Sequence, residues 1–541
     1  MLLFDCHCRV GPRPDKHRRT RWSTAHLLED MDLAEVAGSL VSHAVAHSYD
    51  PLYGNARLDE VLAAAPGRLF GVWCLVPVGS PDFYPHGTAL LQAMERADIR
   101  AVRLVPGGFS LRPEVIGETL AALEHAGVLT LMEAGWAAAT GGDLFACFHD
   151  LLSQHPQLPV LLTDASWAQQ RHVRRLMELH RNLHLEFSSY QANRVVEDYV
   201  SAFGDERLLF GTGGTEKSPG AARALIDYAQ LPPVSRQRLA GGNLVRLLGG
   251  QGPTQAAPAR RPADRCVADA RTGRPQSGLV IDAHAHVLHE GGQGAGVTYL
   301  MSRGDAAGML EVCDWCGIDR IAMMSWVGPV CSDAIAGNEV VQLARQRFGD
   351  RVIGVAVIDP SHLTPAEMAA EIQRRYVEQG FVGLKPYPRM ALSYEDDAFA
   401  PWWAFGNEHR LYGLMHVEGR TGGVAAIGRL AERYPEMSWI IAHSGGSYAF
   451  AEEVAACVVG HPNVYAELTL TPVTNRVVEY LVEATDADHV LFGSDAPMRD
   501  PRPQLGWVVW ADLPLATKDK ILGGNFARLL DRACRPSGPL G

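Results

Sequence analysis

The chain has 541 residues, of which 47% are hydrophobic and 20% charged, and its formal net charge is −12. This length exceeds what one hydrophobic core ordinarily organises, so we expect two or more domains. The acidic balance argues against a surface for nucleic acid or anionic membrane. No segment approaches the roughly 18 consecutive apolar residues of a membrane-spanning helix.

The N-terminal segment MLLFDCHCRVG has neither a basic stretch nor a long apolar stretch, so no secretory signal is predicted. The ten cysteines are scattered along the chain without a regular framework. This usage favours reduced thiols and a cytoplasmic protein.

Apolar segments alternate with amphipathic ones through residues 1–250, from LLFDCHCRV (2–10) to RLLFGT (207–212). Such alternation predicts buried parallel strands connected by helices. The segment 251–278 follows. It is rich in Pro, Gly, Ala and Arg and shows no periodicity, so we predict a linker there.

Beyond the linker, eight apolar segments are predicted strands: LVIDAHAHV (279–287), RIAMMSWV (320–327), VIGVAVID (352–359), FVGLKPYP (381–388), YGLMHVEG (412–419), SWIIAHSG (438–445), VYAELTL (464–470) and HVLFGSDAP (489–497). Eight strand–helix units in about 250 residues are typical of a (β/α)8 TIM barrel. One predicted helix carries Cys313 and Cys316 in a CxxC. With no second CxxC, the pattern favours a buried structural pair over a metal or redox site.

The two halves of the chain repeat each other. Three matched pairs of segments show this: GRLFGVWCLVP (67–77) with DRVIGVAVIDP (350–360), RLLFGTGG (207–214) with HVLFGSDA (489–496), and GGNLVRLL (241–248) with GGNFARLL (523–530). A nearly constant offset along the whole length indicates a duplication. We therefore predict two tandem (β/α)8 TIM barrels, at residues 1–250 and 279–541.

Polar side chains end several predicted strands of the second copy. His284 and His286 are two residues apart on its first strand, so both side chains point into the barrel mouth. His416, His443 and Asp495 end its fifth, sixth and eighth strands, at the face where such barrels carry their active sites. Three or four His and Asp ligands with an open position suit catalytic zinc, and imidazole and carboxylate also suit manganese or iron.

The segments IDAHAHV, GLKPYP, LMHVEG, IIAHSGG, LFGSDAP and ILGGNFARLL resemble the amidohydrolase-related (amidohydrolase 2) branch of the amidohydrolase superfamily over the whole second copy. The resemblance implies that His284, His286, His416 and Asp495 bind one divalent ion, with zinc favoured. It also implies that His443 activates a metal-bound water or polarises the substrate. A carboxylate in the position of Asp495 can in addition take and return a proton, which makes this residue catalytic as well.

Other residues of the second copy leave alternatives open. Three interpretations are open for Lys385. It is a carboxylated ligand that bridges two metals, as in binuclear members of the superfamily, or it contacts a substrate carboxylate, or it belongs to a structural ion pair. Asp282 either supports the metal ligands or is structural. The polar and aromatic side chains on or after the second and fourth strands are candidate substrate-binding residues: Tyr387, Arg389 and Trp326, with Trp402 and Trp403 beside them.

The first copy keeps His7 at the position of His284 but changes the other positions. In place of His286, His416, His443, Asp495 and Lys385 it has Arg9, Glu133, Asp164, Gly213 and Arg103. Arginine has no lone pair to offer a cation, so we predict a degenerate barrel without metal, a pseudoenzyme domain. Because arginine keeps its proton when buried, we expect Arg9 to pair with Glu133 or Asp164.

The leading functional hypothesis is a metal-dependent hydrolase that attacks an amide or a related C–N or C–C bond of a small molecule. The alternative is a metal-dependent, non-hydrolytic decarboxylase of an unsaturated or aromatic carboxylic acid. A binding or scaffold protein is disfavoured by the complete ligand set of the second copy. We expect no nucleic-acid or membrane partner, packing of the two barrels as an intramolecular pseudo-dimer, and room for further homo-oligomerisation.

Overall fold

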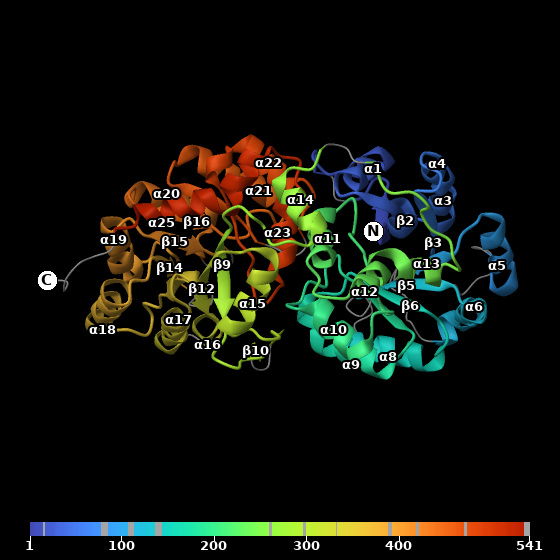
Figure 1. Cartoon of the computed structure of the whole chain (residues 1–541), viewed down its shortest axis with the longest axis horizontal. Helices are drawn as coiled ribbons and strands as arrows, with labels where there is room; N and C mark the ends of the chain where they lie inside the picture. Colours follow the sequence, from blue (N-terminus) through green and yellow to red (C-terminus); the bar gives the residue numbers. More distant parts are fainter. Residues whose placement is uncertain are drawn as a thin grey trace. The chain divides into compact units, whose positions relative to one another are not determined.

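The computed structural model describes the chain apart from residues 15–16, 77–84, 106–112, 136–142, 259–261, 296–298, 332, 388–391, 418–420, 470–472 and 535–541. It divides into two compact units, Met1–Gln191 with Val195–Pro262, and Ala192–Arg194 with Ala263–Gly541. Each unit contains one eight-stranded parallel sheet surrounded by helices, blue to green in the first unit and yellow to red in the second (Figure 1). The predicted pair of (β/α)8 TIM barrels is confirmed.

The sheet of the first barrel runs in sequence order. Its strands are β1 (Leu3–Val10), β2 (Val36–His43), β3 (Leu69–Leu75), β4 (Ala101–Leu104), β5 (Leu129–Glu133), β6 (Val160–Thr163), β7 (Leu183–Glu186) and β8 (Leu208–Leu209). Its helices are α1 (Thr24–Leu33), α2 (Ala44–Ser48), α3 (Pro51–Ala56), α4 (Leu58–Ala63), α5 (Gly87–Arg96), α6 (Pro113–Ala126), α8 (Leu144–Gln154), η1 (Trp167–Gln169), α9 (Gln170–Leu179), α10 (Val195–Phe203), α11 (Pro219–Asp227), α12 (Pro233–Gln237), η2 (Arg238–Gly242) and α13 (Asn243–Leu247).

The sheet of the second barrel has the same order. Its strands are β9 (Ile281–Val287), β12 (Arg320–Ser325), β13 (Val352–Val357), β14 (Gly383–Lys385), β15 (Tyr412–Met415), β16 (Ser438–Ile441), β17 (Val464–Leu468) and β18 (Val490–Phe492), with a small hairpin of β10 (Gly294–Ala295) and β11 (Tyr299–Leu300) after β9.

Helices cover the outside of the second barrel. They are α15 (Ala306–Cys316), α16 (Val327–Cys331), α17 (Ala334–Phe348), η3 (Gly349–Arg351), α18 (Pro365–Ile372), η4 (Gln373–Glu378), η6 (Asp397–Phe399), α19 (Ala400–Glu408), α20 (Gly423–Arg433), α21 (Tyr448–Gly460), α22 (Val477–Ala484), η8 (Ala487–His489), α23 (Pro501–Val509), α24 (Leu515–Asp519), η9 (Lys520–Gly524) and α25 (Asn525–Arg532). Cys313 and Cys316 are both buried on α15, which confirms the predicted helical pair.

Backbone hydrogen bonds close each barrel between its first and last strands. Arg9 N donates to Gly214 O in the first barrel, and His286 N donates to Ala496 O in the second, both at 2.6 Å. Closure brings the segment after the eighth strand against the C-terminal end of the first, where the predicted ligands lie. The interior below is apolar in both barrels, with clusters around Leu131 and Leu161 in the first and Val355 and Leu414 in the second.

The predicted linker is not structureless throughout. Its second half forms α14 (Arg265–Thr272), capped by Asp264, whose side chain accepts a hydrogen bond from Val267 N. Asp264 also pairs with Lys518 at 2.7 Å, so this helix packs as part of the second barrel. This helix is not predicted, because helical spacing over only eight residues is too short a signal among Pro- and Arg-rich neighbours.

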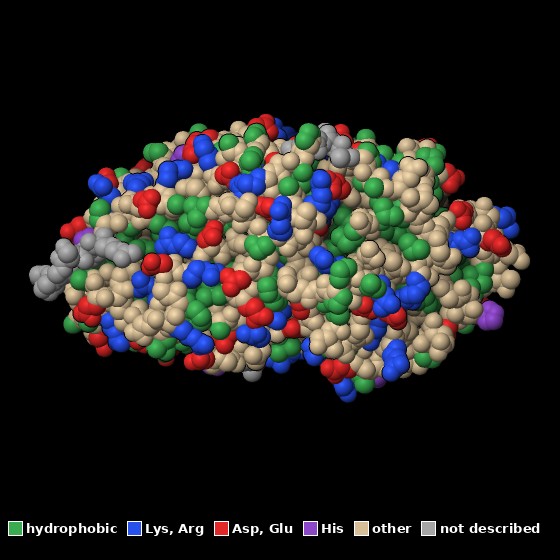
Figure 2. Space-filling view, in the orientation of Figure 1, with side chains coloured by type: hydrophobic (Ala, Val, Ile, Leu, Met, Phe, Trp, Pro, Cys, Tyr) green, Lys and Arg blue, Asp and Glu red, His purple; other side chains and the backbone are tan. Residues whose placement is uncertain are grey.

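Charged side chains of both signs are interspersed over the face seen in Figure 2. Basic side chains do not gather into one stripe on that face, which fits the acidic net charge of the chain. No described helix has the length and apolar character needed to cross a membrane.

Candidate functional site

Three predicted ligands of the second barrel converge at its C-terminal face. Asp495 Oδ1 lies 3.3 Å from His286 Nε2 and 3.6 Å from His284 Nε2, and all three side chains are buried. Ligand atoms on a tetrahedral ion with bonds of about 2.1 Å are themselves about 3.4 Å apart. The separations therefore already match those around one bound ion.

The backbone at the strand ends aims these side chains. Asp495 has φ +60° and His443 has φ +61°, in the left-handed region that non-glycine residues rarely adopt. Such conformations persist where the surrounding structure enforces them, commonly at functional sites. Here they turn both side chains away from their strands and across the barrel mouth.

The protonation states suit metal binding. Burial and then the charge of Lys385 hold the pKa of His284 well below its usual range, so the imidazole is neutral. Burial alone would raise the pKa of Asp495, but contact with His286 and the charge of Arg499 hold it well below its usual range. Asp495 Oδ1 is buried and accepts no hydrogen bond from any described residue. A neutral imidazole pair facing a bare carboxylate oxygen fits a divalent cation.

Sequence reasoning missed Glu467, on β17. Its Oε2 lies 3.1 Å from His284 Nδ1 and accepts a hydrogen bond from His443 N at 3.3 Å, while the Thr469 hydroxyl donates to Oε1. Burial raises the pKa of Glu467 to about 8, and a nearby positive ion would favour its ionised form. A carboxylate behind a ligating histidine fixes the ring so that Nε2 faces the ion. The signal was a lone acid within the apolar segment VYAELTL, matched by Glu186 in the first copy.

His416 and His443 flank the group. The His416 ring lies 4.7 Å from that of His443, and the His443 ring lies 5.2 Å from that of His284. His443 Nδ1 donates to Thr469 O at 2.6 Å, so its Nε2 carries the lone pair. His416 does not belong to the set of ligand atoms within 4.8 Å of one another, which contains His284, His286 and Asp495.

The aromatic candidates divide into two groups. The Trp326 ring packs edge-on against His286 at 4.5 Å, and the Tyr387 ring lies 5.6 Å from His416, so both border the site. Trp402 and Trp403 are buried on α19 and pack in the core, Trp403 against Trp439 at 5.2 Å, so the expectation that they shape the site is wrong. Their position on a helix that faces the core was not predicted from the sequence.

Lys385 and Arg389 are the remaining candidate substrate-binding residues, and the structure describes only the first. Lys385 is fully buried at the end of β14, where its charge lowers the pKa of His284, and its Nζ lies 5.9 Å from the Tyr387 ring centre. Its three interpretations stay open. Arg389 lies outside the residues that the structure describes.

Asp282 has a structural role: its carboxylate forms a clasp, that is, a set of hydrogen bonds between the first strand and the segment after the last. Its carboxylate accepts hydrogen bonds from His284 N and Ser494 N, both at 3.0 Å, and from the Ser494 hydroxyl. These bonds tie the first strand to the segment after the last. Asp5 makes the same bonds with His7 N and Thr212 in the first barrel.

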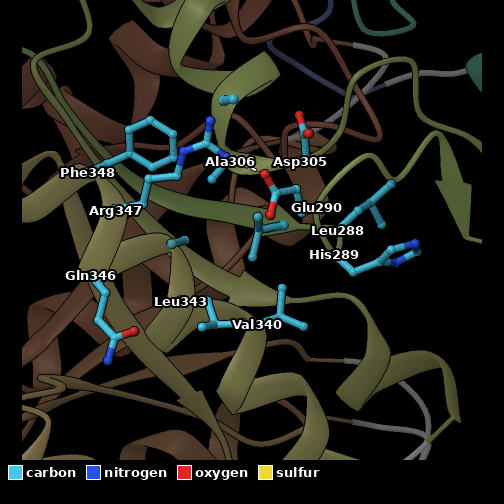
Figure 3. Close-up of a pocket in the computed structure, with 13 residues that line it drawn as sticks. Leu288, His289, Glu290, Asp305, Ala306, Val340, Leu343, Gln346, Arg347 and Phe348 are labelled. Atoms are coloured by element: carbon cyan, nitrogen blue, oxygen red, sulfur yellow. Dashed lines mark hydrogen bonds and ion pairs between the residues drawn. The ribbon is translucent and has the colours of Figure 1, made fainter.

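A separate cavity of about 390 Å³ lies beside the second barrel's site, between the end of β9 and helices α15 and α17. Its walls include Leu288, Val340 and Leu343, with Glu290 and Arg347 paired at 2.6 Å (Figure 3). None of the three converging ligands lines it, so it is not the metal site.

Lys217 lies in the mouth of the first barrel, at the position that Arg499 holds in the second. Lys217 Nζ donates to Asp164 Oδ1 at 2.6 Å, to Ser189 Oγ at 2.6 Å and to Ser188 Oγ at 3.1 Å. A Cβ built on Gly213 would lie 2.8 Å from Lys217 Cδ. Lys217 thus fills the space that an aspartate at position 213 would need.

His7, Asp164 and Glu186 could still hold an ion by spacing alone, because their ligand atoms lie within 4.8 Å of one another. His7 Nε2 is 3.4 Å from Asp164 Oδ2, and His7 Nδ1 is 3.5 Å from Glu186 Oε1. The ammonium of Lys217, however, already pairs with Asp164 at 2.6 Å, which supplies one positive charge to this group.

The predicted partner of Arg9 is wrong. Arg9 Nε lies 3.4 Å from Glu216 Oε1, on the segment after β8. Glu133 pairs instead with Arg103 at 3.0 Å and His47 at 2.9 Å. Ion pairs do fill the mouth of the first barrel, but their cations are Lys217 and Arg103. Lys217 pairs with Asp164 at 2.6 Å and Arg103 with Glu133 at 3.0 Å, both shorter and more buried than the contact of Arg9.

Comparisons with known proteins agree with this architecture. A family model described as "Amidohydrolase" matches residues 4–250 and again residues 281–532. Among solved structures, 2,6-dihydroxybenzoate decarboxylase from Rhizobium is 15% identical, with 47% of this chain and 99% of that one covered and a TM-score of 0.38.

Two further solved structures align in the same way. Dihydroxybenzoic acid decarboxylase from Polaromonas sp. JS666, with bound manganese, is 17% identical over 47% of this chain and 97% of that one, with a TM-score of 0.40. 4-Oxalomesaconate hydratase from Rhodopseudomonas palustris is 18% identical over 47% and 96%, with a TM-score of 0.37. The search of curated proteins gave no match.

Proposed function

This chain belongs to the amidohydrolase family over both of its barrels, and on that premise we propose that the second barrel is a metal-dependent hydrolase. Its substrate is a small molecule with an amide or a related C–N or C–C bond. The supporting observation is the convergence of His284, His286 and Asp495 at separations that match one ion.

His284, His286 and Asp495 would hold the ion, and we propose His416 as a fourth ligand from the neighbouring strand. When bound, the ion polarises the substrate and lowers the pKa of water toward 7. Zinc suits the nitrogen and oxygen donors best, and manganese or iron are also accepted by them.

The residues around the ion would handle protons and position. His443 is neutral, since burial and then His416 hold its pKa well below its usual range, and its Nε2 lone pair is available to take a proton. Glu467 keeps the His284 ring in place from behind. Trp326 would exclude water on the His286 side, where its buried ring packs.

A second candidate is a non-hydrolytic decarboxylase. Its support is Lys385, a buried cation next to the histidines that suits a substrate carboxylate. The hydrolase takes up solvent oxygen, whereas the decarboxylase releases CO₂ without it.

One experiment tests both. Carboxylic acids, amides and cyclic amides are screened with the metal-reconstituted full chain in H₂¹⁸O, and products are analysed by mass spectrometry together with CO₂ release. Label in the product supports the hydrolase, and CO₂ without label supports the decarboxylase. Absence of both, with a full equivalent of metal bound, contradicts an enzymatic role for this site.

For the first barrel we propose a pseudoenzyme domain that does not use a metal. The support is the lysine ammonium against Asp164 and the glycine at the position of Asp495. The hydrogen bonds of Asp5 to Thr212 would keep this barrel closed without an ion.

A further inference from the structure

The first barrel carries a large hollow at the end opposite to its degenerate site. The hollow has a volume of about 960 Å³ and lies around the N-terminal ends of β7 and β8, with α13 at one side. This volume is in the range of small-molecule sites. Its walls include the apolar side chains Pro156, Pro159, Met177, Phe203 and Leu247.

Three arginines line this hollow: Arg181, Arg207 and Arg246. The Arg207 guanidinium is fixed by hydrogen bonds to Leu183 O at 3.0 Å and His180 O at 2.7 Å. Arg246 donates to Glu206 O at 2.8 Å. Within the described part of the chain, none of the three forms an ion pair with a carboxylate.

The acids that line the same hollow are neutralised by arginines outside it. Glu178 pairs with Arg175 at 3.0 Å, and Asp205 pairs with Arg238 at 2.7 Å. Glu206 also lies within 4.0 Å of Arg238. Asp205 and Glu206 share Arg238, and none of the described lining acids pairs with Arg181, Arg207 or Arg246, so positive charge is in excess along the lining. Burial and then the charge of Arg181 lower the pKa of Arg207 to about 10.

His184 adds a buried polar group to the wall. It is 6% exposed, and its buried Nδ1 has no hydrogen-bond partner among the described residues. Burial, followed by the charges of Arg246 and Arg207, lowers its pKa to about 3, so the ring is neutral. A buried imidazole without a partner costs stability unless a ligand or water meets it.

Among the described residues, the corresponding end of the second barrel lacks the unpaired arginines of the hollow. The positions of His184, Arg207 and Arg246 hold Tyr465, His489 and Arg528. Arg528 pairs with Asp488 at 3.2 Å, and His489 pairs with Asp486 at 2.9 Å. The uncompensated charge is thus a feature of the first barrel and not of the fold.

We propose that this hollow is a binding site for a phosphate group, free or carried by a small organic ester, held by Arg181, Arg207 and Arg246. Guanidinium groups match phosphate oxygens in geometry and charge. The apolar walls suit the organic part of an ester. The site lies in the barrel that lacks the metal ligands, and it gives that barrel a role separate from catalysis.

Calorimetric titration of the full chain at constant ionic strength tests the proposal. The probes are inorganic phosphate and phenyl phosphate. Arg181→Gln and Arg246→Gln remove two exposed side chains, and Arg528→Gln is the matched control on the second barrel. Each of the first two changes should weaken binding about tenfold, and the control should leave it unchanged.

The outcomes separate the sources of the phosphate. Equal affinity for both probes identifies free phosphate as the ligand, and tighter binding of phenyl phosphate identifies an ester; both support the site. Lack of saturable binding contradicts it. So does binding that both arginine variants leave unchanged, because that result places the phosphate elsewhere, for example at the metal site.

Discussion

The two barrels differ in how their mouths hold positive charge. In the second barrel, His284 and His286 converge on Asp495 Oδ1, while Arg499 lies 3.7 Å from Asp495 Oδ2. In the first, a lysine side chain provides the cation, and a glycine leaves the room for it. A covalently attached ammonium is always present, cannot exchange and cannot activate water. Lys217 matches Arg499 of the second barrel in sequence, so both mouths carry a cation at this position, and what differs is its partner: Asp164 in the first barrel and Asp495 in the second.

Two buried carboxylates occupy the same positions in both barrels. Asp5 and Asp282 make the same clasp between the first strand and the segment after the last, and Glu186 and Glu467 both stand behind the first histidine. The aspartates keep each barrel closed, and the glutamates orient the ring of the first histidine, His7 or His284. The residues that changed are the predicted ligands and their neighbours: His286, His416, His443, Asp495 and Lys385.

The largest effect should follow loss of a metal ligand. His286→Ala is expected to remove the ion and to abolish measurable turnover, because the ion supplies the proposed chemistry and even a residue supporting a ligand is worth about 10–100-fold. Elemental analysis and turnover measure this. The matched control, His7→Ala in the first barrel, should change neither. A loss of metal in that control would show that the first barrel also binds an ion.

The next effect concerns His443. His443→Asn should lower turnover about 10²- to 10⁴-fold while the metal content stays unchanged, because the residue is proposed to move a proton and not to bind the ion. Rates and metal content are measured on the same preparation. A variant that has lost its metal would instead identify His443 as a ligand.

The fold and the ligand group could be predicted because their signals are local. The alternation of apolar segments and the matched repeats predict two barrels, and an HxH at a strand end fixes its own spacing. Lys217, Glu186 and Glu467 were missed because their roles depend on which strands become neighbours after closure. Arg9 was given the wrong partner for the same reason: Glu216 reaches it from the segment after β8. Comparing the two copies at every buried charge, as well as at the ligands, would have found the carboxylates.

Lys217→Met should destabilise the first barrel. It leaves Asp164 without the ammonium that is 2.6 Å away, and because Asp164 is only partly buried the loss should be about 1–3 kcal/mol, less than for a fully buried pair. Urea denaturation of the full chain measures the loss, and Lys217→Arg is the control that keeps the charge. Added zinc should restore part of the stability of Lys217→Met, since His7, Asp164 and Glu186 are then free to bind it. No difference between the methionine and arginine variants would show that the ammonium does not hold this mouth together.

The smallest effect concerns acid stability. Burial alone would raise the pKa of Glu133, but hydrogen bonding to His47 and the charge of Arg103 lower it from 4.5 to about 2. A carboxyl whose folded pKa is depressed contributes stability above its unfolded pKa, and this contribution is lost as pH falls from about 4.5 toward 2. Glu133→Gln removes the titration, so the decline in unfolding free energy between pH 5 and pH 3 should be smaller than in the wild type, by on the order of 1 kcal/mol. Urea denaturation at the two pH values measures the difference. An unchanged decline would show that Arg103 and His47 do not hold Glu133 ionised, and the charge pairing of the first mouth would then rest on Lys217 and Asp164 alone.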